Sequence, residues 1–256
     1  MPDPRDLIKK QFGANAERYV TSTVHAKGES LDRLVEIADP KPEWRALDLA
    51  TGGGHTALAI APRVREVVVT DLTPEMLSVA RKHLESKGVT NAVYQEADAC
   101  KIPFPDGSFD LVTCRIAPHH FHDVAAFVSE TYRVLRPKGM AVVIDNVVPE
   151  DPEAGDFINR FEKHRDPSHH RCLTIPEWGD LFMKAGFQEL HVEHFFKAIE
   201  FEAWSDIKSV DERTRGELRE MLVDAPPKAL DALFPEDRND KLWFYLQELL
   251  IAGRRA

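Results

Sequence analysis

Residues 45 to 57 read RALDLATGGGHTA, and this stretch decides the fold. It begins as an apolar run typical of a buried strand and breaks into three glycines, Gly52 to Gly54, before a helix candidate begins at His55. Glycines permit positive φ angles and let a ligand approach the backbone closely. The spacing Gly52-x-Gly54-x-x-Ala57 also matches the dinucleotide fingerprint, which places a pyrophosphate at the N-terminus of a helix.

A carboxylate just before the glycines argues against a dinucleotide. Asp48 lies four residues before Gly52, where its negative charge would repel a pyrophosphate but would attract a ligand that carries an ammonium and a sulfonium group. Adenosylmethionine is such a ligand. The stretch therefore predicts an adenosylmethionine site at the end of the first strand.

The surrounding sequence alternates apolar strand-like runs with amphipathic segments, which predicts an α/β fold built on a parallel sheet. We expect a doubly wound, Rossmann-like, mostly parallel sheet of seven strands with helices on both faces, which binds its ligand at the carboxyl ends of the strands. The last strand could equally be a helix, because its apolar positions allow both periods. The expected strands are 45–50, 66–71, 92–98, 109–115, 140–147, 189–201 and 243–255.

The flanking segments are expected to enclose the site within one domain, residues 1–256. Residues 1–40 are predicted to form an N-terminal helical cap, and residues 41–150 are predicted to form the cofactor-binding core. Residues 151–186 and 202–240 predict helical insertions that cover the substrate, since the second of them is longer than structural connections usually are.

Composition limits the partners. The chain has 33 Lys and Arg against 43 Asp and Glu, and the resulting net charge of -10 disfavours binding to a nucleic-acid backbone. Three widely spaced cysteines, Cys100, Cys114 and Cys172, indicate neither a disulfide framework nor a thiolate zinc site. The sequence has no apolar signal segment at its start and no apolar run long enough to span a bilayer. We expect a soluble cytoplasmic protein whose partner is a small molecule, with the oligomeric state open and a homodimer among the options.

Further motifs follow the glycine turn at suitable spacing. They are Asp71 at the end of the next strand, Asp98-Ala99, the run from Ile102 to Asp106, and Ser108-Phe109-Asp110. Together with the glycine turn they resemble the class I adenosylmethionine-dependent methyltransferases, and within them the ubiquinone/menaquinone C-methyltransferase-like group, methyltransferase type 11. The resemblance covers about residues 10 to 150, and Ala50 stands where the family pattern has its first glycine.

The resemblance implies contacts with each part of adenosylmethionine. The glycine turn and Asp48 would hold the methionine end, and Asp71 would accept hydrogen bonds from the ribose hydroxyls. Asp98 and the backbone N–H of Ala99 would meet the adenine edge. Tyr19 resembles an aromatic residue that closes over the cofactor, although packing explains it equally well. The expected cofactor-binding residues are Tyr19, Asp48, Ala50, Gly52, Gly54, Asp71, Leu72, Met76, Asp98, Ala99 and Arg115.

Two histidines, His119 and His120, follow the fourth strand, where active-site groups collect in such sheets. An imidazole titrates near neutral pH and could take a proton from a phenol, an enol or a carbon acid. We expect His120 to be the base, with His119 as second choice, and Asp145 to orient or polarise one of them. The alternative is that both histidines cap the next helix or pack beneath the insertions. No metal site is expected, because the spaced histidine pairs match no known metal signature.

These expectations describe an enzyme that transfers a methyl group from adenosylmethionine to a small-molecule acceptor by in-line displacement, with adenosylhomocysteine as the product. The acceptor could be carbon or oxygen of a quinol-like or phenolic compound. Two alternatives stay open at this point. One is an NAD-dependent oxidoreductase, and the other is a protein that binds adenosylmethionine or adenosylhomocysteine without transferring the methyl group.

Overall fold

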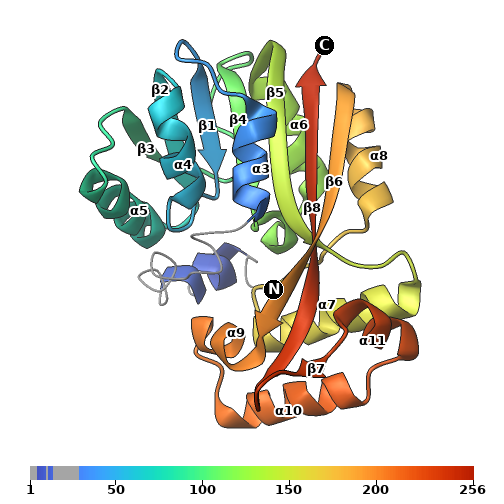
Figure 1. Ribbon diagram of the computed structural model, residues 1–256. Helices are drawn as coiled ribbons and strands as arrows, with labels where there is room; N and C mark the ends of the chain where they lie inside the picture. The colour runs from blue at the N-terminus through green and yellow to red at the C-terminus, as the bar shows by residue number, and fades with distance from the viewer. Residues whose placement is uncertain (1–4, 10, 14–28) are drawn as a thin grey trace.

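The computed structural model describes residues 5–9, 11–13 and 29–256. Its centre is an eight-stranded sheet whose main path follows the order β3-β2-β1-β4-β5-β8-β6 (Figure 1). The neighbours from β3 to β5 are parallel, whereas β8 runs antiparallel to β5 and β6. The doubly wound, mostly parallel sheet is thus confirmed. The strands are β1 (Arg45–Leu49), β2 (Glu66–Asp71), β3 (Ala92–Glu96), β4 (Phe109–Arg115), β5 (Leu135–Val147), β6 (Phe187–Glu200), β7 (Glu236–Asp237) and β8 (Leu242–Arg255).

Helices cover both faces of this sheet, because each presents one apolar stripe to it. On one face, α3, α4 and α5 bury residues such as Leu34, Ile60 and Leu84. On the other face, α6 and α8 bury Phe127 and Trp178. These helices are α3 (Glu29–Ala38), α4 (His55–Ile60), α5 (Pro74–Ser86), α6 (Val124–Val134) and α8 (Ile175–Ala185).

The last expected element, residues 243–255, could be a strand or a helix from its apolar pattern, and in the structure it is a strand. β8 lies between β5 and β6 and pairs with both of them. Its residues 249–252 are all buried in succession, which explains why the apolar pattern did not alternate. Trp243 to Arg255 is therefore an extended, doubly covered strand and not a helix.

A second lobe lies beyond the main sheet, where β6 and β8 continue past it (Figure 1). Its own apolar core joins four helices to the far halves of these two strands, with Phe161, Phe201 and Phe244 among the buried side chains. The helices are α7 (Pro152–Arg165), α9 (Phe201–Ile207), α10 (Glu212–Val223) and α11 (Pro227–Leu233). The lobe faces the carboxyl end of β1, and the helical residues 5–9 and 11–13 lie between them (Figure 1).

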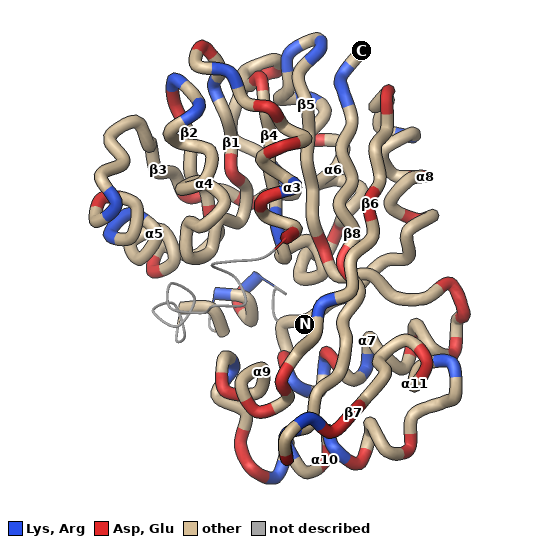
Figure 2. Tube along the Cα trace, in the orientation of Figure 1, with Lys and Arg blue, Asp and Glu red and all other residues tan. Residues whose placement is uncertain are grey.

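Charged residues are distributed over both parts of the molecule. Figure 2 shows acidic and basic residues interspersed along the main sheet and the second lobe. Within the described ranges, no helix is long and apolar enough to cross a membrane.

Candidate active site

A cavity opens at the carboxyl ends of β1, β2 and β4, where the strand order reverses on the two sides of β1. This is where doubly wound sheets bind their ligands. Its wall is made by four loops that follow strands and by the N-terminal helical residues. The lining includes Arg5, Ile8, Phe12, Ala50, Thr51, Gly52, Gly53, His55, Thr56, Asp71, Leu72, Thr73, Ala97, Asp98, Ala99, Cys100, Arg115, Ile116, Ala117, His120, Phe121 and His122.

The turn after β1 presents its backbone to this cavity. Ala50 has a φ of 50° and Gly52 a φ of 54°, so both of these turn residues are in the left-handed region. Glycine adopts that region without strain, whereas an alanine Cβ crowds the following carbonyl. Ala50 is the position at which the family pattern carries glycine, and the strained φ explains that preference.

Gly54, which is predicted to contact the cofactor, has a packing role in the structure. It has a φ of 83° and does not belong to the lining of the cavity. A Cβ at this position would lie 2.5 Å from Leu84 Cδ1 and 3.3 Å from Ala80 Cβ. The glycine therefore lets α5 pack closely against the turn.

Asp48, which is predicted to hold the methionine end of the cofactor, lies within β1. Its side chain is buried and lies outside the lining of the cavity. Its Oδ2 accepts a hydrogen bond from Thr51 Oγ1 at 2.6 Å, and its Oδ1 accepts one from Thr113 Oγ1 at 2.8 Å. Burial raises the pKa of Asp48 to about 6. The carboxylate thus ties the turn to β4.

Asp71, at the end of β2, faces the cavity as predicted for a ribose contact. Its two oxygens accept the backbone N–H groups of Gly52 and Thr73, each at 3.0 Å. These bonds fix the carboxylate at the rim, and each oxygen retains a second lone pair. Leu72 lines the same cavity, but Met76 does not: it is buried against Phe12, Val79 and Ile207.

The segment after β3 supplies the opposite wall. Asp98 and Ala99 both line the cavity. Asp98 Oδ1 accepts the backbone N–H of Cys100 at 2.8 Å, and its Oδ2 lies 3.5 Å from the Arg5 guanidinium. Sequence reasoning missed Arg5, Ile8 and Phe12 as individual wall residues, since no motif in the N-terminal segment singles them out. Tyr19 lies outside the described residues.

A second cavity adjoins the first and shares Phe12, Ile116 and His120 with it. It lies between the main sheet and the second lobe. Aliphatic and aromatic side chains form much of its wall, and the rest is made by basic side chains together with Asn146 and Glu248. The remaining lining residues are His119, Asn146, Arg165, Lys197, Ile199, Trp204, Ile207, Lys208, Leu246 and Glu248.

His119 and Asp145 form a buried pair beside this second cavity. The Nδ1 of His119 lies 2.6 Å from Asp145 Oδ1, and both side chains are nearly inaccessible to solvent. Burial lowers the pKa of His119, but the charge and hydrogen bond of Asp145 outweigh it, so that the pKa is raised above 6.5. The pair has the arrangement in which a carboxylate orients an imidazole for proton transfer.

His120, the predicted first choice for the base, is in a different environment. Its Nδ1 lies 3.0 Å from the backbone oxygen of Ser168, which assigns the proton to that nitrogen. Its Nε2 lies 3.9 Å from Asp166 Oδ2. Burial, together with the charges of His119 and Lys208, holds the pKa of His120 well below 6.5. An imidazole whose pKa is held this low is a weak base.

The basic residues of the second cavity each have an acidic neighbour. Lys197 pairs with Glu248 at 2.8 Å, and Lys208 pairs with the buried Asp166. Arg165 lies 3.4 Å from Glu162 and stacks over Trp204. At the end of β4, Arg115 lines the first cavity. Its Nε lies 3.4 Å from Thr56 Oγ1. Across the described part of the chain, no three His, Cys, Asp or Glu side chains gather as metal ligands.

Comparison with known proteins agrees with the geometry. A family profile described as a methyltransferase domain matches residues 47–143. An uncharacterized methyltransferase of Bacillus subtilis, YcgJ, is 40% identical over 193 residues, which are 75% of this chain and 76% of that protein. A demethylmenaquinone methyltransferase of Thermus thermophilus is 44% identical over 115 residues, which are 44% of this chain and 52% of the relative.

Solved structures give the same result. The crystal structure of YcgJ superposes with a TM-score of 0.84 at 34% identity, covering 88% of this chain and 97% of that one. A putative methyltransferase of Bacillus halodurans gives a TM-score of 0.83 at 39% identity, covering 89% and 99%. The chain belongs to the adenosylmethionine-dependent methyltransferases that its sequence resembles.

Proposed function

We propose that this enzyme methylates carbon or oxygen of a small phenolic or quinol-like acceptor, which binds in the second cavity. The observation that carries the proposal is the meeting of the two cavities at Phe12, Ile116 and His120. In-line displacement requires the acceptor atom to be held against the methyl group. Two adjoining cavities with a shared wall suit that requirement.

The first cavity would hold adenosylmethionine, which supplies a methyl group activated by its bond to a sulfonium. Asp71 is fixed by two backbone N–H groups and would accept hydrogen bonds from the ribose hydroxyls. Asp98 and the Ala99 backbone N–H would recognise the adenine edge, with Leu72 against the ring. The turn after β1 and Arg115 would hold the methionine end. Asp48 would act indirectly, because it fixes Thr51.

The acceptor class is supported by the wall of the second cavity. Trp204, Ile199 and Leu246 offer an apolar surface suited to a flat carbon skeleton. The name of the Thermus thermophilus relative, demethylmenaquinone methyltransferase, favours an aromatic acceptor for this chain as well. Residues 151–186 and 202–240 would cover the acceptor, since Arg165, Trp204 and Lys208 come from them.

The residue that would remove the acceptor proton is His119. It lines the second cavity, and Asp145 holds its Nδ1, which leaves Nε2 as the nitrogen that can accept a proton. His120 would instead shape the wall between the cavities. A general base contributes about 100-fold to 10,000-fold in rate when it is correctly placed.

A transfer assay tests the proposal. The purified enzyme is incubated with adenosylmethionine and a panel of catechols, hydroquinones and naphthols, and mass spectrometry measures adenosylhomocysteine and the methylated product. We expect one member of the panel to gain a methyl group at a rate far above that of the Asp71→Ala variant. A protein that binds adenosylmethionine but leaves the whole panel unmethylated, while it methylates amines or thiols, would contradict the proposed acceptor class.

A further inference from the structure

The wall that would read the adenine edge has little support from the sheet. β3 ends at Glu96 and β4 begins at Phe109, and the segment between them makes one isolated bridge, Asp98 to Lys101, among the described residues. Asp98, Ala99 and Cys100 in this segment line the first cavity. One backbone hydrogen bond, from the N–H of Ala97 to the oxygen of Asp71 at 3.0 Å, ties the start of the segment to β2, and contacts from other elements hold the rest.

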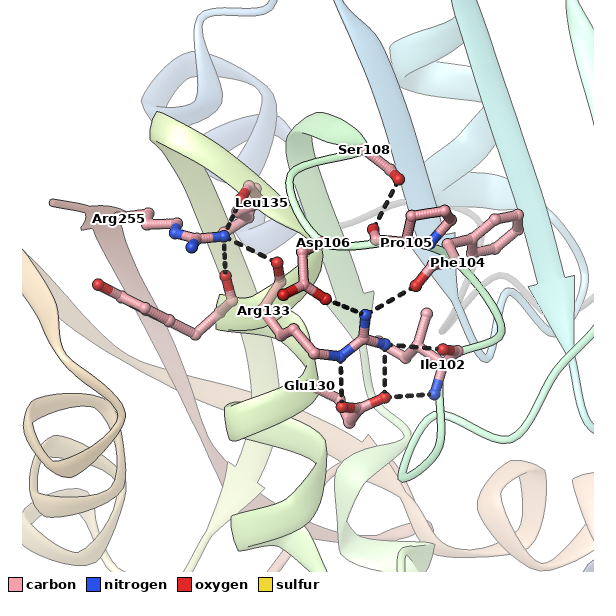
Figure 3. A network of polar contacts seen from close by, with 10 residues as sticks. Ile102, Phe104, Pro105, Asp106, Ser108, Glu130, Arg133, Leu135 and Arg255 are labelled. Carbon is pink, nitrogen blue, oxygen red and sulfur yellow. Dashed lines mark hydrogen bonds and ion pairs between the residues drawn. The ribbon is translucent and has the colours of Figure 1, made fainter.

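An arginine on α6 contacts this segment at several points (Figure 3). Arg133 Nη2 donates to the backbone oxygen of Ile102 at 2.9 Å, and Nη1 donates to the backbone oxygen of Phe104 at 2.7 Å and to Asp106 Oδ1 at 2.8 Å. The remaining donors, Nε and Nη2, bind the two carboxylate oxygens of Glu130 at 2.7 and 2.8 Å. All five N–H donors of the guanidinium are thus used.

Glu130 completes the contact from the same helix. Its Oε2 accepts the backbone N–H of Ile102 at 2.8 Å. Both backbone polar groups of Ile102 are therefore held by one arginine and one glutamate, three residues apart on α6 (Figure 3). A planar, bidentate pair of this kind is more rigid than a single hydrogen bond.

The helix that carries the pair is itself anchored. Arg255, at the end of β8, donates from Nη1 to the backbone oxygens of Tyr132 at 3.2 Å and Arg133 at 2.7 Å, and it also reaches Leu135 (Figure 3). A cation at the C-terminus of a helix also complements the helix dipole. α6 and β8 therefore help to hold residues 102–106 of the segment in place.

We propose that Arg133, held by Glu130, is a positioning residue for recognition of the adenine of adenosylmethionine. Ile102 follows Cys100 by two residues, so fixing its backbone restricts where Asp98 and Ala99 can lie. The inference rests on the proposed contact of these two residues with the adenine edge. Arg133 touches neither the first cavity nor the second, so its effect is transmitted through the segment.

The test compares two ligands that differ only at the base edge. S-inosylhomocysteine carries an oxo group where adenosylhomocysteine has its exocyclic amine, and calorimetry gives the Kd of each. We expect the wild-type enzyme to prefer adenosylhomocysteine by about tenfold or more, the amount that one hydrogen bond to a charged group is worth. Arg133→Met should reduce that preference to about threefold or less by weakening adenosylhomocysteine alone.

Two further variants sharpen the result. Arg136→Met is the matched control, because Arg136 pairs with Asp110 on β4 at 2.8 Å and should keep the wild-type preference. Glu130→Gln weakens the contact of Arg133 and Glu130 with the segment by a milder change. It replaces Arg133→Met in the test if circular dichroism shows that Arg133→Met does not fold. A folded Arg133→Met or Glu130→Gln variant that keeps the preference, or that loses affinity for both ligands equally, would overturn the inference. A wild-type enzyme without any preference would instead overturn the assignment of Asp98 and Ala99, and the inference with it.

Discussion

Replacing Asp48 by Asn distinguishes a carboxylate that contacts the ligand from a buried carboxylate that holds the turn in place. The sequence favoured a contact with the positive charges of the ligand, whereas the structure buries the carboxylate between Thr51 and Thr113. Asparagine has the same shape, and its amide can accept a hydrogen bond from one threonine and donate one to the other. The substitution therefore removes the charge and keeps the packing.

The size of the effect follows from the pKa of Asp48, which burial raises from 3.8 to about 6. A raised pKa means that the folded state binds the proton more tightly than the unfolded state. The penalty is absent below about pH 3.8, grows as pH rises, and is complete above about pH 6. The gap corresponds to about 3 kcal/mol at neutral pH. Asp48→Asn should therefore gain about 2–3 kcal/mol relative to wild type between pH 4 and pH 7.5.

Urea denaturation at these two pH values measures the difference. Comparing the same variant at both pH values cancels any contribution that does not depend on protonation. Asp156→Asn, at an exposed position on α7, is the control. A stability difference between Asp48→Asn and wild type that stays constant with pH would refute the buried carboxylate. A loss of adenosylmethionine affinity of about 100-fold in the folded variant would instead indicate that Asp48 contacts the ligand directly.

Three other predictions concern the glycine turn and the histidines. Ala50→Gly should raise the free energy of unfolding by about 1 kcal/mol, because it removes a left-handed alanine; a destabilised variant in urea denaturation would contradict this. Gly54→Ala should lower stability by about 2 kcal/mol or more, since the new Cβ meets the buried Leu84, and an unchanged melting temperature would rule out that close approach. His119→Gln should lower kcat by about 100-fold or more with cofactor affinity preserved, whereas His120→Gln should lower it less; the opposite order would return the base to His120.

The sheet and much of the cofactor-side wall could be predicted from the sequence. A strand that ends in Asp71 beside a glycine turn leaves few choices for where that carboxylate lies, and the structure places it at the rim of the cavity. Asp98 and Ala99 follow the same logic. Asp71 sits at the end of β2, and Asp98 and Ala99 follow the end of β3 closely, so the topology decides which edge of the sheet they share.

Residues away from strand ends could not be placed in this way. Asp48 belongs to β1 itself. Only the pairing of β1 with β4 shows that Thr113 donates a hydrogen bond to its carboxylate. The different environments of His119 and His120 come from Asp145 and Asp166, which lie on β5 and at the end of α7. Side-chain direction and partners from distant elements are products of tertiary packing, so local sequence patterns do not contain them.

We propose that the cavity at the carboxyl ends of β1, β2 and β4 binds adenosylmethionine through Asp71. Isothermal calorimetry of the wild-type protein and Asp71→Ala with adenosylmethionine, adenosylhomocysteine and NAD tests it most directly. We predict that the wild type binds both adenosyl ligands but not NAD, and that Asp71→Ala weakens binding by about 1–3 kcal/mol. Binding of NAD in place of the adenosyl ligands, or an Asp71→Ala variant with unchanged affinity, would contradict the account.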